Sequence, residues 1–78
     1  MKFDIKLNTI EEVKKFCEAA TKVNTDVFIK QGRYTIDAKS IMGIFSLNLL
    51  ELLELEIDEV TEDIDDFIDI VLSMNIIR

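Results

Sequence analysis

Apolar and charged residues alternate at the start of the chain. Phe3, Ile5 and Leu7 fall on one side of an extended segment over residues 2–7, with charged residues on the other side, which is the pattern of a half-buried strand. Thr9 and Glu12 then have the spacing of a capping box. Apolar residues recur after Thr9 at the spacing of one helix face, so we predict a helix over 10–21. This face consists of Ile10, Val13, Phe16, Cys17 and Ala20.

The rest of the chain divides into four shorter patterns. Segments 26–30 and 34–38 are rich in β-branched and aromatic residues and flank a glycine, which predicts a hairpin. Segment 40–47 predicts a short helix with Ser40 at its N-cap and Asn48 as a left-handed stop. Leucine and isoleucine alternate with glutamate over 53–57, which predicts a fourth strand. A last helix opens at Thr61, with an apolar face of Val60, Ile64, Phe67, Ile68, Val71 and Leu72.

The element order is therefore β-α-β-β-α-β-α. Four strands and three helices that each need one apolar cover favour an α+β two-layer sandwich, in which helices pack on one face of an antiparallel or mixed sheet. The chain has 78 residues, no proline and two glycines, and no linker is visible. We expect a single domain over 1–78.

Composition removes several classes of chemistry. The chain has no histidine, which excludes histidine-based acid–base catalysis, metal ligation and phosphohistidine. The net charge is -7, and 10 of the 16 acidic residues lie in 51–78, so we expect no nucleic-acid partner. Asp65, Asp66 and Asp69 lack the spacing of a calcium loop. We expect no metal and no cofactor.

The cysteine content and the length of the apolar runs indicate in which cellular compartment the protein is expected. Cys17 is the single cysteine, so no internal disulfide can form and a reducing cytoplasm is the default expectation. The first ten residues do not have the apolar core of a signal peptide, and no apolar run is as long as a membrane span. We expect a cytoplasmic protein without a membrane partner, in which Cys17 is a core residue.

The segment from Ala38 to Leu47 resembles HPr, the histidine-containing phosphocarrier of the bacterial sugar phosphotransferase system. The family pattern is close to KSIMGVMSLG, and the identical residues are Lys39, Ser40, Ile41, Met42, Gly43, Ser46 and Leu47. The similarity extends without a gap upstream to Ala19 and downstream to Ile57, and the element order is that of HPr. The resemblance implies the HPr fold, an open-faced sandwich with a four-stranded antiparallel sheet.

The phosphocarrier site of the family is not retained. HPr carries a Gly-x-His-Ala-Arg-Pro stretch at the start of its first helix, and the ungapped alignment puts Thr9 at the histidine and Glu11 at the arginine. Glu11 and Glu12 place negative charge where a phosphoryl group needs positive charge. We therefore expect no catalytic residue, no enzymatic activity and no phosphate relay.

The second HPr site is retained. The resemblance implies that Ser40 is the serine that a dedicated HPr-type kinase phosphorylates, and that a neighbouring apolar patch docks protein partners. This patch comprises Ile41, Met42, Ile44 and Phe45. The expected function is a regulatory docking module that binds the kinase, a carbon-catabolite regulator or a phosphotransferase-system component. Two alternatives stay open: a carrier that uses Thr9 or Asp4 as acceptor, and a structural or assembly protein that reuses the fold.

Overall fold

The computed structural model describes residues 1–78 and contains the predicted elements in the predicted order. They are β1 (Lys2–Ile5), α1 (Ile10–Thr21), β2 (Val27–Gln31), β3 (Tyr34–Asp37), α2 (Ile41–Phe45), β4 (Leu53–Ile57) and α3 (Glu62–Ser73). The bounds of α1 and β4 are those predicted, and the other elements differ by one or two residues. None of the three helices has the length and apolar character that a bilayer span requires.

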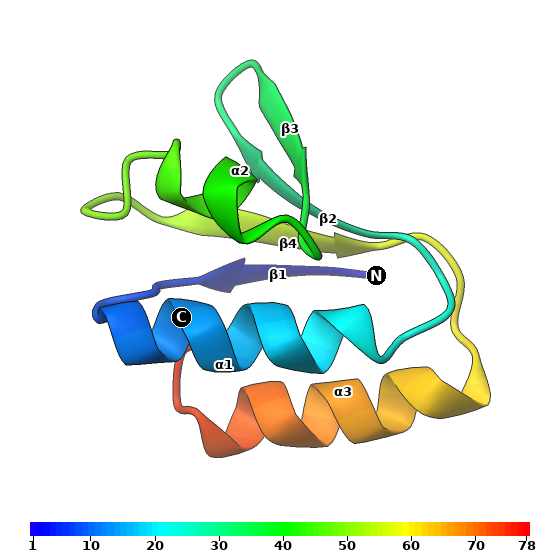
Figure 1. Ribbon diagram of the computed structural model, residues 1–78. Coiled ribbons are helices and arrows are strands. Elements are labelled where there is room, and N and C mark those ends of the chain that lie inside the picture. The colour runs from blue at the N-terminus through cyan, green and yellow to red at the C-terminus, as the bar shows by residue number, and fades with distance from the viewer.

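The strands form one sheet in the order β1-β4-β2-β3, and every neighbouring pair is antiparallel. Helices α1 and α3 lie side by side in opposite directions on one side of this sheet (Figure 1). The other side of the sheet is open to solvent. The predicted α+β fold with four antiparallel strands and helices on one face is therefore confirmed.

The core lies between the sheet and the helices. In β4, Leu53, Leu55 and Ile57 are buried while the intervening glutamates are partly exposed, as period-two alternation requires. Two aromatic rings join the helices: Phe16 of α1 meets Phe67 of α3 edge-to-face, with ring centroids 5.7 Å apart. Edge-to-face contact suits the ring quadrupoles, so these rings hold the two helices together over the sheet.

Several sequence predictions about single residues are wrong. Ile10, Val60 and Leu72 were expected in the apolar helix faces but are exposed. Ile10 is the first residue of α1 and Val60 lies before the start of α3, so neither is inside a helix that could turn it toward the core. Leu72 is inside α3 but lies beside its buried face. Asn48 does not adopt the left-handed conformation. The residue that does is Asn75, with φ of 56° directly after α3.

Residues 76–78 pair with the edge strand β1, which the sequence did not predict. The N–H of Lys6 donates to the Ile76 carbonyl at 2.8 Å, and the N–H of Arg78 donates to the Asp4 carbonyl at 2.8 Å. Ile77 forms a bridge with Ile5, and Ile76 is fully buried. The outer edge of β1 is therefore covered by the end of the chain.

The start of α3 is tied to the loop after α1 through Asp63. One oxygen of Asp63 accepts the N–H of Asn24 at 2.8 Å, and the other accepts the Thr61 hydroxyl. These hydrogen bonds, that from Thr61 first, lower the pKa of Asp63 below its usual value, because they favour the charged carboxylate.

Asp63 should therefore contribute to the acid stability of the fold. Since its folded-state pKa is depressed, its contribution is complete above the pKa of an unfolded aspartate, about 3.9, and is lost as the pH falls below that value. We expect Asp63→Asn to lower stability at neutral pH and to reduce the loss of stability between about pH 4 and pH 2. Urea titrations across this range check the result, and Asp69→Asn, an exposed position on the same helix, is the control. Equal acid dependence in Asp63→Asn and the wild type would contradict it.

Candidate functional site

The start of α1 has the predicted capping box. Thr9 is the N-cap and its Oγ1 accepts the N–H of Glu12 at 3.0 Å. In return, Oε1 of Glu12 accepts the N–H groups of Asn8 at 2.7 Å and Thr9 at 3.2 Å. The reciprocal bonds satisfy donors that a helix otherwise leaves free at its N-terminus.

These bonds decide which ligand the start of α1 can take. A helix N-terminus attracts anions because its N–H groups and dipole both favour negative charge. Here the Glu12 carboxylate already occupies two N–H donors, and Glu11 adds a second exposed carboxylate in the same turn. A phosphoryl group at Thr9 would therefore meet two carboxylates in the first turn of the helix, which oppose its negative charge.

Asp4, the other alternative acceptor, lies in a different layer of the fold. It is exposed on β1, where it faces Glu54 in the register and alternates with the buried Ile5. This alternation puts Asp4 on the open face of the sheet, whereas Thr9 begins a helix on the covered face. The structure does not bring Thr9 and Asp4 together in one site.

Ser40 lies at the turn between β3 and α2. Its N–H donates to the Asp37 carbonyl at 2.9 Å, and its Oγ accepts the N–H of Gly43 at 3.1 Å. The Asp37 carboxylate accepts the N–H of Lys39 at 2.9 Å. Ser40 is therefore the predicted N-cap of α2, and it is an exposed residue with a hydroxyl proton free for solvent.

Gly43 allows α2 to pack closely on β3. A Cβ atom at Gly43 would collide with Cγ2 of Ile36, a residue of β3 that packs against the core. A larger residue would push α2 away from the sheet. Gly43 thus determines how far the segment with Ser40 stands from the core.

The four apolar residues predicted as a docking patch separate into two groups. Met42 is 77% exposed and Phe45 39% exposed, and they lie three residues apart on the outer side of α2. Ile41 is half-buried against the core. Ile44 is 0% exposed and belongs to the core, so its prediction as a docking residue is wrong. A single helical turn that rests on a sheet must turn one side chain inward, and Ile44 is that residue.

Two exposed leucines were not identified from the sequence. Leu50 and Leu52 lie in the loop between α2 and β4 and are largely exposed. The signal was present in Leu49-Leu50-Glu51-Leu52, because adjacent leucines do not fit the alternation of the following strand. They extend the exposed apolar surface beyond α2.

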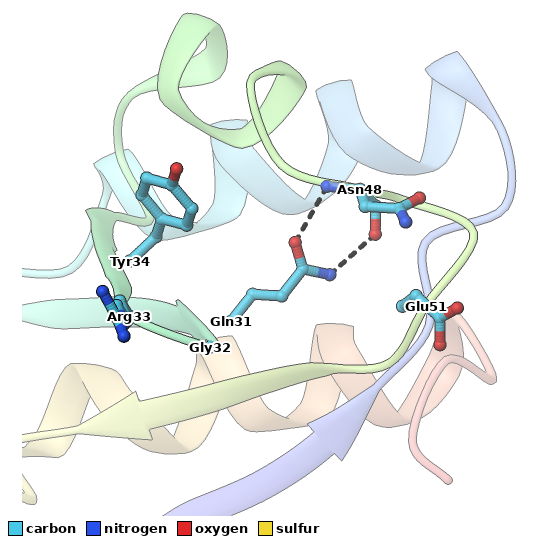
Figure 2. A pocket seen from close by; sticks show the side chains of 6 residues that line it. All are labelled: Gln31, Gly32, Arg33, Tyr34, Asn48 and Glu51. Atoms are coloured by element: carbon cyan, nitrogen blue, oxygen red, sulfur yellow. Dashed lines mark hydrogen bonds between the residues drawn. The ribbon is translucent and has the colours of Figure 1, made fainter.

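This loop is fastened to the β2–β3 turn by a pair of hydrogen bonds (Figure 2). Nε2 of Gln31 donates to the Asn48 carbonyl at 2.7 Å, and Oε1 of Gln31 accepts the N–H of Asn48 at 2.8 Å. The bonds lie in an open hollow of about 370 Å³, which is lined by Gln31, Gly32, Arg33, Tyr34, Asn48 and Glu51. Because both the nitrogen and the oxygen of the Gln31 amide are hydrogen-bonded to the Asn48 backbone, the role of Gln31 is to hold the loop.

Cys17 is placed as a core residue, and no cluster of metal ligands is formed. Its thiol is buried and donates to the Lys39 carbonyl at 3.3 Å. Burial, and secondarily the Asp37 charge, raise the pKa of the Cys17 thiol, so the reactive thiolate is disfavoured. No group of three or more acidic or cysteine side chains is positioned to hold a metal ion.

A family model identifies the family of this chain, and solved structures share its fold. The family model described as the PTS HPr component phosphorylation site matches residues 11–71, a span that begins after Thr9. The structure is similar to that of HPr-C-His from Thermoanaerobacter tengcongensis, with a TM-score of 0.72, 23% identity, and 95% of this chain and 86% of that chain covered.

A second solved structure gives the same result. The phosphocarrier protein HPr from Bacillus anthracis strain Ames matches with a TM-score of 0.66 and 20% identity, over 90% of this chain and 94% of that chain. No curated protein matches the chain. At these identities the structural likeness concerns the fold, and the family model carries the family assignment.

Proposed function

Because this chain belongs to the HPr family, whose proteins interact with components of the sugar phosphotransferase system, we propose that it is a regulatory, protein-docking member of that family. It acts in the cytoplasm through the segment that begins at Ser40. It carries no phosphate between phosphoenolpyruvate and sugar permeases.

The observation that carries this proposal is the occupied start of α1. The chain has no histidine, and the Glu12 carboxylate accepts the Asn8 and Thr9 N–H groups. A phosphocarrier site needs both a nucleophile and free donors for the phosphoryl oxygens. The absence of that nucleophile, together with the Glu11 and Glu12 carboxylates in the first turn, argues that phosphate relay has been given up, while the Ser40 segment keeps the sequence of the family.

The geometry of Ser40 supports its modification by a kinase. A phosphate on an N-cap hydroxyl is favoured by the N–H groups and dipole at the start of a helix, and the Ser40 hydroxyl is exposed beside the Gly43 N–H. The phosphate would add about two negative charges close to Met42 on the exposed side of α2. Phosphorylation would thereby change the charge of the docking surface without requiring the segment to unfold.

The partners expected for this surface are proteins that bind its apolar residues and also contact Ser40. Methionine and phenylalanine suit an adaptable interface, and Met42 and Phe45 supply them. An HPr-type serine kinase, a carbon-catabolite regulator or a phosphotransferase-system component fits this description. A carrier with acceptor Thr9 or Asp4 is the alternative within the same system.

The test is phosphorylation by an HPr-type serine kinase with ATP. We expect the wild type to incorporate one phosphate per chain and Ser40→Ala to incorporate none. Ser46→Ala is the matched control, since Ser46 is at the other end of α2 and its hydroxyl only donates to the Gly43 carbonyl, at 2.6 Å. Equal labelling of Ser40→Ala and wild type would show that Ser40 is not the site.

A further inference from the structure

The two edges of the sheet differ in how they are protected. The outer edge of β1 is covered by residues 76–78, whose backbone bonds Asp4 and Lys6. At the opposite edge, β3 is the terminal strand, and Figure 1 shows no other segment beyond it. Natural proteins protect open edges with short strands, charged residues, proline, bulges or a covering segment. Of these, Tyr34–Asp37 has only its short length and one charged residue, Asp37. The chain thus has one open edge.

The hydrogen-bond alternation of the β2–β3 hairpin tells which groups face outward. Gly32 has φ of 58° and occupies the first central position of a two-residue turn, as in tight hairpins. The N–H of Ala38 donates to Val27 at 2.9 Å, so every second residue of β3 from Ala38 bonds β2. Thr35 lies between these positions, and its N–H and carbonyl point away from the sheet.

We propose that β3 pairs with β3 of a second copy of this chain, antiparallel about a twofold axis at Thr35, to give a continuous eight-stranded sheet. A twofold interface uses the same surface on both copies. At the axis each Thr35 N–H would donate to the Thr35 carbonyl of the second copy. The occupant is a second copy because the strand is complementary to itself in this register.

Charge selects the register. With Thr35 on the axis, Arg33 of each copy, which is the second residue of the turn and directly precedes β3, comes next to Asp37 of the other at the end of the paired strands. Both side chains are exposed, and only one oxygen of Asp37 is used, by the N–H of Lys39. The alternative with Asp37 on the axis would set two carboxylates opposite each other, which is unfavourable.

The other face of the strand adds apolar contacts in the same register. Tyr34 is 67% exposed, and in this pairing it lies opposite Ile36 of the second copy, which is half-buried. An aromatic residue opposite a β-branched one is a favourable cross-strand pair. Two such pairs and two ion pairs flank the central hydrogen bonds. Since four-residue edges bury less surface than a standard interface, the dimer is weak, with a Kd on the order of 100 µM.

The test is sedimentation equilibrium between about 10 µM and 1 mM protein, combined with amide chemical shifts over the same range. We expect a monomer–dimer equilibrium, with concentration-dependent shifts centred on residues 33–37. Thr35→Pro should abolish it, because proline removes the outward N–H while an edge strand tolerates proline at such a position. A monomer at all concentrations, or a dimer whose shifts lie at β1 or α2, would overturn the proposal.

Charge exchange provides a test that does not depend on the proline variant. Arg33→Asp and Asp37→Arg should each weaken the dimer by about 10-fold or more, and the double variant should recover most of the lost affinity because it restores opposite charges. Lys14→Asp, an exposed reversal on α1, is the control for net charge. A double variant as weak as the two single variants would refute the Arg33–Asp37 register. Circular dichroism of each variant verifies that the monomer is folded.

Discussion

Incubation with phosphoenolpyruvate and the first enzyme of the phosphotransferase system is expected to leave this protein unlabelled, and nearly unlabelled when Thr9 is replaced by histidine. In Thr9→His the imidazole is present, but the Glu12 carboxylate still accepts the N–H groups at positions 8 and 9. Loss of one preorganised donor for a developing anion costs about 100-fold or more in rate. We expect labelling of Thr9→His at least 100-fold slower than that of an HPr with its own histidine.

A variant that also removes the acidic residues separates the effect of the missing histidine from the effect of the Glu11 and Glu12 carboxylates. Thr9→His combined with Glu11→Arg and Glu12→Ala frees the N–H donors and reverses the charge, so labelling should rise by about 10-fold or more over Thr9→His alone. Loss of the capping box costs about 1 kcal/mol, so circular dichroism is needed to verify folding. Rapid labelling of the wild type, or of Thr9→His alone, would contradict the claim that Glu11 and Glu12 block the site.

We expect Met42→Glu to weaken recognition of the Ser40 segment without weakening the fold. Because Met42 is 77% exposed, its replacement should change stability by no more than about 0.5 kcal/mol. A glutamate in the docking surface places a charge against the apolar part of a partner, which we expect to cost about 10-fold to 100-fold in affinity. With an HPr-type kinase as the probe, this appears as a higher KM for Ser40 phosphorylation and a smaller change in kcat.

Leu72→Glu is the matched control for that variant. Leu72 is also an exposed apolar residue, but it lies on α3, away from α2. Its replacement adds the same charge and should leave the KM unchanged. If both variants raise the KM equally, the effect comes from net charge, and the α2 surface is not the docking site. Ile44→Glu cannot be used, because Ile44 is in the core and a buried charge would unfold the protein.

Features that depend on neighbouring residues could be predicted from the sequence. The capping box at Thr9 and Glu12 and the N-cap at Ser40 both connect residues three positions apart, so their signature is contained in a few letters. The bounds of α1 and β4 follow from periodicities sustained over 12 and 5 residues. For the same reason the capped and acidic start of α1 could be recognised before the structure was known.

Features that depend on distant pairing could not be predicted. Nothing near Ile76 indicates that it fills the core or that Ile77 meets Ile5, because the partner strand is at the other end of the chain. The bonds between Gln31 and Asn48 connect two loops in the same way. In α2, a helix of 5 residues is too short for periodicity to distinguish the inward Ile44 from the outward Met42.

The most direct measurement is the position of phosphate on this protein after exposure to both phosphate donors at once. The mixture holds phosphoenolpyruvate with the first enzyme of the phosphotransferase system, and ATP with an HPr-type serine kinase. Fragmentation mass spectrometry at neutral pH then locates the modification. A regulatory protein with a blocked α1 start predicts phosphate on Ser40 alone. Phosphate on Thr9 or Asp4, or a Ser40 that remains unmodified, would contradict the proposed function.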